Sequence, residues 1–161
     1  MGKYELRRYI QTANTQITDF NNQIAELERK IVVYQKDKIK LMDMYVTMQN
    51  SYIKKRADVD LARARAKGTA MTSFIARFDE LYGNERWRKA AVSFENMEEV
   101  IQNNIWQAQK KIEELKSQIA SMENNISGWQ NEIRQIERQE KEQQNAKNKS
   151  AISRITRKGV K

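Results

Sequence analysis

Carboxylates are the side chains of this sequence best suited to acid–base chemistry, because its 161 residues include neither His nor Cys. That absence removes the commonest general base and metal ligand, and also the thiolate nucleophile. Three acidic pairs lie close along the chain: Glu98–Glu99, Glu113–Glu114 and Asp58–Asp60. On a helix, residues one or two positions apart do not face each other. We therefore interpret these pairs as solvated surface and expect no catalytic residue, cofactor or metal site.

Apolar residues near the middle of the chain are candidates for binding rather than catalysis. Trp87, Ala91 and Phe94 follow the spacing i, i+4, i+7, which places them on one face of a helix. Such a face can pack where two helices turn, or it can bind a partner protein. The residues that we predict to bind a partner are Trp87, Ala91, Phe94, Met97, Phe78 and Trp106.

The C-terminal segment is strongly basic. No acidic residue follows Glu142, and the cations after it supply +6 of the net charge of +9. Such a segment can bind phosphates or an anionic surface. The candidates for this contact are Lys147, Lys149, Arg154, Arg157 and Lys158. The alternative interpretation is a flexible, solvated tail over residues 146–161.

Two segments that flank the centre carry apolar residues with alternating spacings of three and four. The first runs from Leu6 to Tyr52 and is interrupted at Lys38; the second runs from Ile101 to Ile136. This spacing is the heptad pattern of a coiled coil. With no Pro to break a helix, both segments are predicted to be long helices.

Breaks between the two heptad segments allow the chain to fold back on itself. Residues 54–67 are charged and rich in Ala, so we expect a solvated helix with little core there. Gly68 interrupts this helix, and Phe74, Phe78 and Leu81 predict a short apolar face before a turn at Gly83. The predicted fold is all-α: a long antiparallel helical hairpin or coiled coil with a short helix near the bend. It forms one domain over residues 1–145, followed by the basic tail.

Further apolar residues lie outside the heptad positions. They are Tyr9, Val32, Val33, Ile39, Met42 and Trp106. Two paired helices would leave part of this surface in water, and a partner helix or a second copy would cover it.

The region around Trp87 resembles the Trp-x-Gly hairpins of bacterial type VII secretion, in which this motif lies between two antiparallel helices. The motif would correspond to Trp87, Arg88 and Lys89, so that Lys89 stands where the motif has Gly. Ala91 and Phe94 follow it. Over roughly residues 1–140 the layout is similar to YwqH-like proteins, small helical proteins encoded beside LXG-type toxins. This resemblance implies an adaptor that pairs with the helical domain of a toxin and helps to present it for secretion.

Three non-enzymatic functions remain open. The first is the adaptor for a helical partner, and the second is a structural coiled coil of a phage or cell envelope that associates with itself. The third is a nucleic-acid-associated protein that uses the basic tail. Without a run of about 18 apolar residues or an apolar signal segment, we expect a cytoplasmic protein, or one exported or held at the envelope through its partner.

Overall fold

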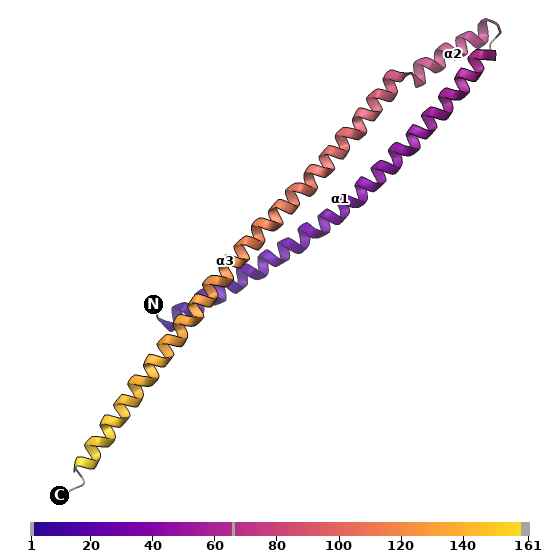
Figure 1. The fold of residues 1–161 in the computed structure, drawn as a ribbon. Helices are drawn as coiled ribbons and strands as arrows, with labels where there is room; N and C mark the ends of the chain where they lie inside the picture. Colours follow the sequence, from indigo (N-terminus) through magenta and orange to yellow (C-terminus); the bar gives the residue numbers. More distant parts are fainter. Residues whose placement is uncertain (1, 66, 159–161) are drawn as a thin grey trace. The chain divides into compact units, whose positions relative to one another are not determined.

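The described residues of the chain form three α-helices. A computed structural model describes the backbone of residues 2–65 and 67–158; the side chains of residues 81, 82, 84 and 150–158 lie outside this description. The helices are α1 (Lys3–Arg65), α2 (Thr69–Tyr82) and α3 (Asn84–Lys158) (Figure 1). The described residues contain no strand, which confirms the predicted all-α class. α2 is the short helix that was predicted near the bend.

Two compact units divide the helices between them. The first unit comprises residues 1–25 and 112–161, and the second comprises residues 26–111. In the first unit, Arg7 pairs with Glu137 at 3.2 Å, Lys3 pairs with Glu140, and the ring of Tyr9 lies 5.7 Å from that of Trp129. Partner numbers rise on α3 as they fall on α1, so the two segments run antiparallel.

The second unit also pairs α1 with α3 in antiparallel fashion, and it contains α2. Lys38 contacts Glu98, whereas Tyr52, farther along α1, contacts Trp87, which lies earlier on α3. This pairing agrees with the predicted hairpin topology.

The predicted heptad positions form the core of both units. The heptad positions are those that follow one another at alternating spacings of three and four, from Leu6 to Tyr52 and from Ile101 to Ile136. Each of these positions is buried or half-buried. The most deeply buried include Leu6 in α1 and Leu115 in α3. The periodicity of burial follows from helix geometry, since residues spaced three and four apart share one face.

The core extends farther toward α2 than the sequence indicated. Val59 is 4% exposed, although residues 54–67 were predicted to have little core. On α2 Ile75 is buried, Phe78 is half-buried and Phe74 is exposed, while the side chain of Leu81, the third residue of the predicted apolar face, lies outside the described ones. Val59 is buried because α2 folds against α1. The sequence around Val59 contains no sign of this contact, since α2 follows later in the chain.

Glycines mark both ends of α2. Gly68 precedes it with a φ of 101°, a conformation that side chains with a Cβ rarely adopt. Gly83 separates α2 from α3 and accepts the first hydrogen bond of α3, from the Trp87 N–H at 3.3 Å. These positions agree with the predicted break and turn.

α3 continues to Lys158, so residues 146–158 of the predicted tail have a helical backbone. Lys147 and Lys149 are exposed. Arg154, Arg157 and Lys158 have side chains outside the described ones, and the proposed boundary at residue 145 stays a prediction.

Candidate partner-binding surface

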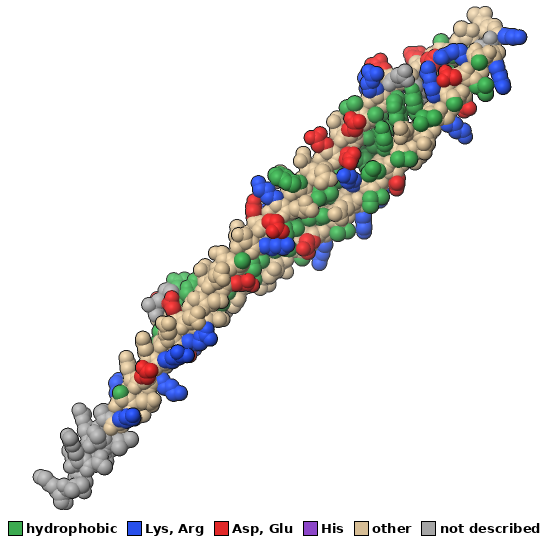
Figure 2. Space-filling view, viewed as in Figure 1, with side chains coloured by type: hydrophobic (Ala, Val, Ile, Leu, Met, Phe, Trp, Pro, Cys, Tyr) green, Lys and Arg blue, Asp and Glu red, His purple; other side chains and the backbone are tan. Residues whose placement is uncertain are grey.

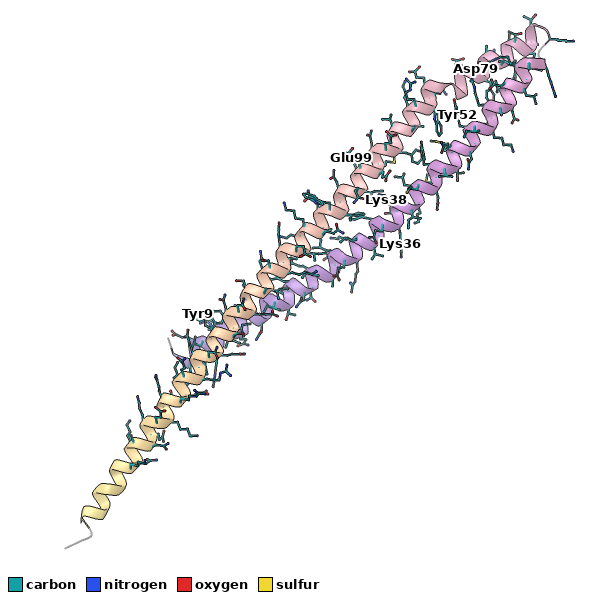
Figure 3. All side chains as sticks on the ribbon, in the orientation of Figure 1. Tyr9, Lys36, Lys38, Tyr52, Asp79 and Glu99 are labelled. Carbon is teal, nitrogen blue, oxygen red and sulfur yellow. The ribbon has the colours of Figure 1, made fainter. Side chains whose placement is uncertain are left out.

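An aromatic cluster joins α1 to α3 in the second unit. Trp87 stacks on Tyr52, with ring centroids 4.8 Å apart and planes 15° apart, and its ring lies 6.0 Å from that of Tyr45. Tyr45 in turn meets Phe94 edge to face at 5.5 Å. Tyr45 and Tyr52 are heptad positions of α1, and Phe94 and Trp87 lie one and two heptads before Ile101, so the antiparallel pairing brings the four rings together. Figure 3 shows Tyr52 at this cluster, between the two helices.

A polar layer follows the aromatic cluster along the same pair of helices. Lys38, which interrupts the heptad pattern of α1, donates to Gln102 at 3.1 Å and pairs with Glu98 at 3.1 Å (Figure 3). Glu98 lies three residues before Ile101, which continues the spacing of the second heptad segment, and it is half-buried. Opposite charges at facing core positions favour one register of the two helices over its neighbours.

One side of the helix pair is hollowed into two adjoining grooves. The first has a volume of about 720 Å³ and the second about 600 Å³, and Met44 lines both. The aromatic part of the first groove is formed by Tyr52, Trp87 and Phe94. Met97 and Val100 line the second, and both are more than half exposed. We call this side, with Met44, Met97 and Val100, the groove side. Hydrophobic side chains also gather on the face of the α2-containing unit that Figure 2 shows.

Charged residues border these apolar grooves. Asp43, Lys55 and Arg86 line the first groove, and Asp37 and Lys40 line the second. A helical ligand with an apolar stripe and mixed charges beside it would match this lining.

The residues predicted to bind a partner do not share one surface. Trp87, Ala91 and Phe94 are half-buried, and the rings of Trp87 and Phe94 pack against tyrosine rings of α1. Met97 lies on the groove side. Trp106 is 52% exposed beneath Lys110, whose Nζ lies 5.4 Å from the ring centre, and Trp106 lines neither groove.

Phe78, the remaining member of the predicted set, lies on α2 and is half-buried. Its ring meets that of Phe74 at 6.4 Å. No observation tests whether these six residues bind a partner, and their binding role stays a prediction.

A second apolar surface runs along α1, and two of its residues, Val32 and Ile39, are among the apolar residues predicted outside the heptad positions. Val32, Ile39, Val46 and Ile53 repeat every seven residues and are 48–62% exposed. We call these four residues the α1 stripe. The sequence itself contains this pattern. Each member of the stripe follows a heptad position between Ile31 and Tyr52 by one residue, and the members therefore share the seven-residue repeat of the core.

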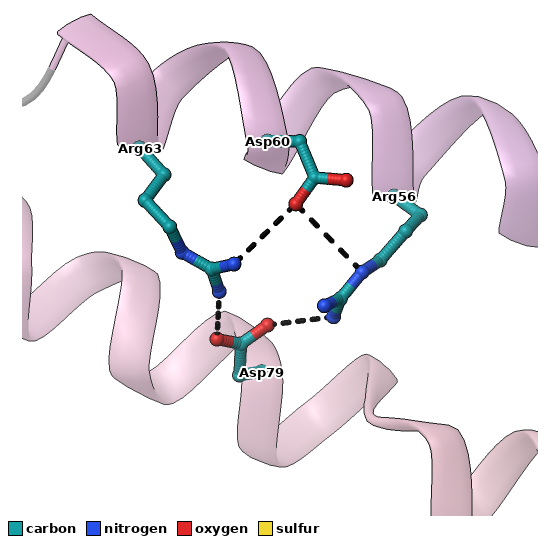
Figure 4. A network of polar contacts seen from close by, with 4 residues as sticks. All are labelled: Arg56, Asp60, Arg63 and Asp79. Atoms are coloured by element: carbon teal, nitrogen blue, oxygen red, sulfur yellow. Dashed lines mark hydrogen bonds and ion pairs between the residues drawn. The ribbon is translucent and has the colours of Figure 1, made fainter.

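A network of ion pairs holds α2 on α1 (Figure 4). Asp79 of α2 accepts from Arg56 at 2.9 Å and also pairs with Arg63, so one carboxylate binds two guanidinium groups. Asp60 lies beside both arginines, 3.9 Å from Arg56 and 3.4 Å from Arg63. Because all four residues satisfy one another, this network positions α2 rather than offering a free acid for catalysis.

Glu26 and Lys30 form a surface pair on α1 in which each group shifts the pKa of the other. Lys30 donates a hydrogen bond to Glu26 at 2.7 Å and lowers the pKa of that carboxyl, and the same contact raises the pKa of Lys30. Both groups are exposed and lie one turn apart on α1, as expected of an i,i+4 helix pair. Among the described residues, no three His, Cys, Asp or Glu side chains gather as metal ligands would.

No family model matches the chain, and comparisons with curated proteins and with solved structures give no match either. Within the described residues, none of the three helices contains a stretch apolar and long enough to span a bilayer.

Proposed function

We propose that this protein is a non-catalytic adaptor that binds a helical segment of another protein along the groove side. The observation that carries the proposal is the pair of adjoining grooves, which together are lined by apolar residues from both α1 and α3. A monomeric protein rarely leaves such a surface in water unless the surface binds something.

The chemistry of the groove side favours a helix as its ligand. An amphipathic helix binds by laying anchors at i, i+3, i+4 and i+7 into an apolar groove. Met44, Met48 and Met97 supply unbranched, polarisable side chains that adapt to different anchors. The aromatic rings of Trp87 and Phe94 supply a rigid floor beside them.

The resemblance of Trp87, Ala91 and Phe94 to the type VII secretion hairpins supports a specific partner. We include in the proposal that the ligand is the helical domain of a secreted toxin, and that the adaptor accompanies it to the secretion apparatus. The location of Trp87 beside the first groove is compatible with this function.

Site-specific photocrosslinking in the native host tests the proposal. A photoreactive phenylalanine analogue at Met97 should capture one helical protein in stoichiometric yield, and the same analogue at Tyr4, which is 83% exposed in the other unit, should not. Adding Val100→Asp should abolish capture at Met97 while helicity is retained, because a charge in an apolar groove is poorly solvated.

Three results would overturn the adaptor function. They are equal capture at Met97 and Tyr4, capture of this chain alone, and recovery that disappears after nuclease treatment. The second result would support a structural coiled coil, and the third would support a nucleic-acid-associated protein.

A further inference from the structure

We propose that the α1 stripe is the contact surface of a symmetric, antiparallel dimer of this chain. The four apolar residues of the stripe line neither groove, although Asp43, which lies beside the stripe, also lines the edge of the first groove. The dimer therefore does not depend on the proposed adaptor function.

The seven-residue repeat of the stripe indicates that a helix binds along it. The heptad period of the four residues places them in one line along α1, and a partner helix follows such a line. Gln35, Met42 and Gln49 lie three residues after the first three members, so the second line is mostly polar. This composition is typical of a weak helix–helix contact rather than of a permanent core.

Charges beside the stripe identify the occupant as a second copy. Lys36 and Asp43 are both exposed, one heptad apart, and neither forms an ion pair within the described part of the chain. Figure 3 shows Lys36 on the outer side of α1, away from Lys38 and α3. Seven residues span about 10.5 Å along a helix, which is too far for these two charges to meet within one chain.

An antiparallel second copy brings these charges together twice. With the two-fold axis at Ile39, Ile39 meets its own counterpart and Val32 of each copy meets Val46 of the other. The same alignment places Lys36 of each copy beside Asp43 of the other. Moving the axis midway between Ile39 and Val46 would instead place the two Asp43 carboxylates together, which is unfavourable. The contact is closed, because each copy uses the same surface.

The size of the contact sets its strength. With the axis at Ile39, Ile53 of each copy lies opposite Ala25 of the other, so the alignment spans about 28 residues, or roughly 42 Å at about 1.5 Å per residue. One helix about 10 Å wide then buries roughly 800 Å² in total over that length. Stable interfaces bury about 1,200 Å² or more, so the dimer is expected to form in the micromolar range.

Oxidative crosslinking of the full chain tests both the contact and its direction. The protein has no Cys, so a single introduced thiol reports only on its own counterpart. Ile39→Cys should yield a disulfide-linked dimer under mild oxidation, whereas Val32→Cys and Val46→Cys should each remain mostly unlinked. The double variant Val32→Cys/Val46→Cys should form linked dimers again.

Analytical ultracentrifugation over about 5 to 500 µM, a range that spans the micromolar affinity expected of a small interface, supplies the second measurement. The wild type should dimerise with rising concentration, and Ile39→Asp should raise the dimer Kd at least tenfold. Val33→Asp is the matched control. Val33 is 54% exposed and follows Val32 on α1 but is not part of the stripe, so this substitution should leave dimerisation unchanged.

Charge exchange tests the register. Lys36→Asp and Asp43→Lys should each weaken the dimer, and the double variant should restore it. Three results would overturn the proposal: a helical wild type that stays monomeric throughout, equal crosslinking at all single Cys positions as in a parallel pair, and equal loss with Ile39→Asp and Val33→Asp. Met97→Asp should leave the dimer intact, which separates this result from failure of the adaptor function.

Discussion

The indole of Trp87 lies flat on the ring of Tyr52, with centroids 4.8 Å apart and planes 15° apart. The two residues are far apart in the sequence, so this stack exists only because α3 returns along α1. It lies between the ion-pair network of α2 and the polar layer of Lys38, and it forms the aromatic floor of the first groove.

Trp87→Ala should destabilise the second unit. Removing a half-buried indole that touches two tyrosine rings should lower the free energy of unfolding by about 2–4 kcal/mol. Thermal unfolding followed by circular dichroism measures the change. Tyr4→Ala is the control, because an 83% exposed aromatic should change stability by less than about 0.5 kcal/mol. Equal effects of the two substitutions would mean that the stack does not stabilise the fold.

Asp79→Asn should loosen α2 from α1. The substitution keeps the size of the side chain but removes the charge that binds Arg56 and Arg63. We expect a loss of about 1–2 kcal/mol, moderated because these groups are partly solvated, and faster hydrogen exchange over residues 69–82.

Asp60→Asn is the matched control for that network. Asp60 pairs with the same two arginines but belongs to α1, so its loss leaves the link to α2 in place. Hydrogen exchange of α2 should then stay close to that of the wild type. Faster exchange in both variants would show that α2 is held by something other than Asp79.

Gly83→Ala and Gly128→Ala should shift stability in opposite directions. A Cβ at Gly83 would lie 2.4 Å from the backbone oxygen of Asp79, so the α2–α3 connection must move, at a cost of about 1–3 kcal/mol. A Cβ at Gly128 meets nothing within 4 Å in the middle of α3, and Ala there should stabilise by about 0.5–1 kcal/mol. Denaturant unfolding of both variants measures the signs, and a stabilising Gly83→Ala would contradict the close approach.

The pairing of Lys38 with Glu98 should appear in a double-mutant cycle. Lys38→Glu and Glu98→Lys should each destabilise the protein, and the double exchange should recover about 0.5–1 kcal/mol, because the pair is partly solvated. Chemical denaturation at low and high salt provides the coupling energy. A coupling of zero at low salt would assign the register to the apolar positions alone.

Acid should weaken the surface pair on α1. The pKa of Glu26 is lowered from its ordinary 4.5 by the hydrogen bond from Lys30, so its stabilisation is present above that value. It is lost as the pH falls through the lowered pKa of the folded state. Glu26→Gln should therefore reduce the melting temperature slightly at pH 7 but not at pH 2.5, a small difference that differential scanning calorimetry can resolve. A difference that persisted at pH 2.5 would show that the charge is not responsible.

The core positions of this protein could be read from its sequence with little loss. From Leu6 to Tyr52 and from Ile101 to Ile136, spacing alone located the buried side of each helix. This succeeds because helix geometry is local, and a repeat of three and four residues selects one face regardless of what covers it. The breaks at Gly68 and Gly83 were accessible for the same reason, since each is a property of the backbone at one position.

The candidate surfaces depended on contacts between distant segments. Nothing near Val59 indicates that α2 will cover it, and nothing near Asp79 identifies Arg56 and Arg63 as its partners. Trp87 is of a residue type common at binding surfaces, and the return of α3 places its ring against Tyr45 and Tyr52 at the edge of the first groove. Met44 and Val100, which the sequence did not single out, join it in lining the grooves. The sequence by itself determined the helices and their inward faces, because those follow from the periodicity of a single helix. The tertiary structure decided which remaining apolar residues share a surface, because that depends on the register in which α1 meets α3 and on where α2 folds back.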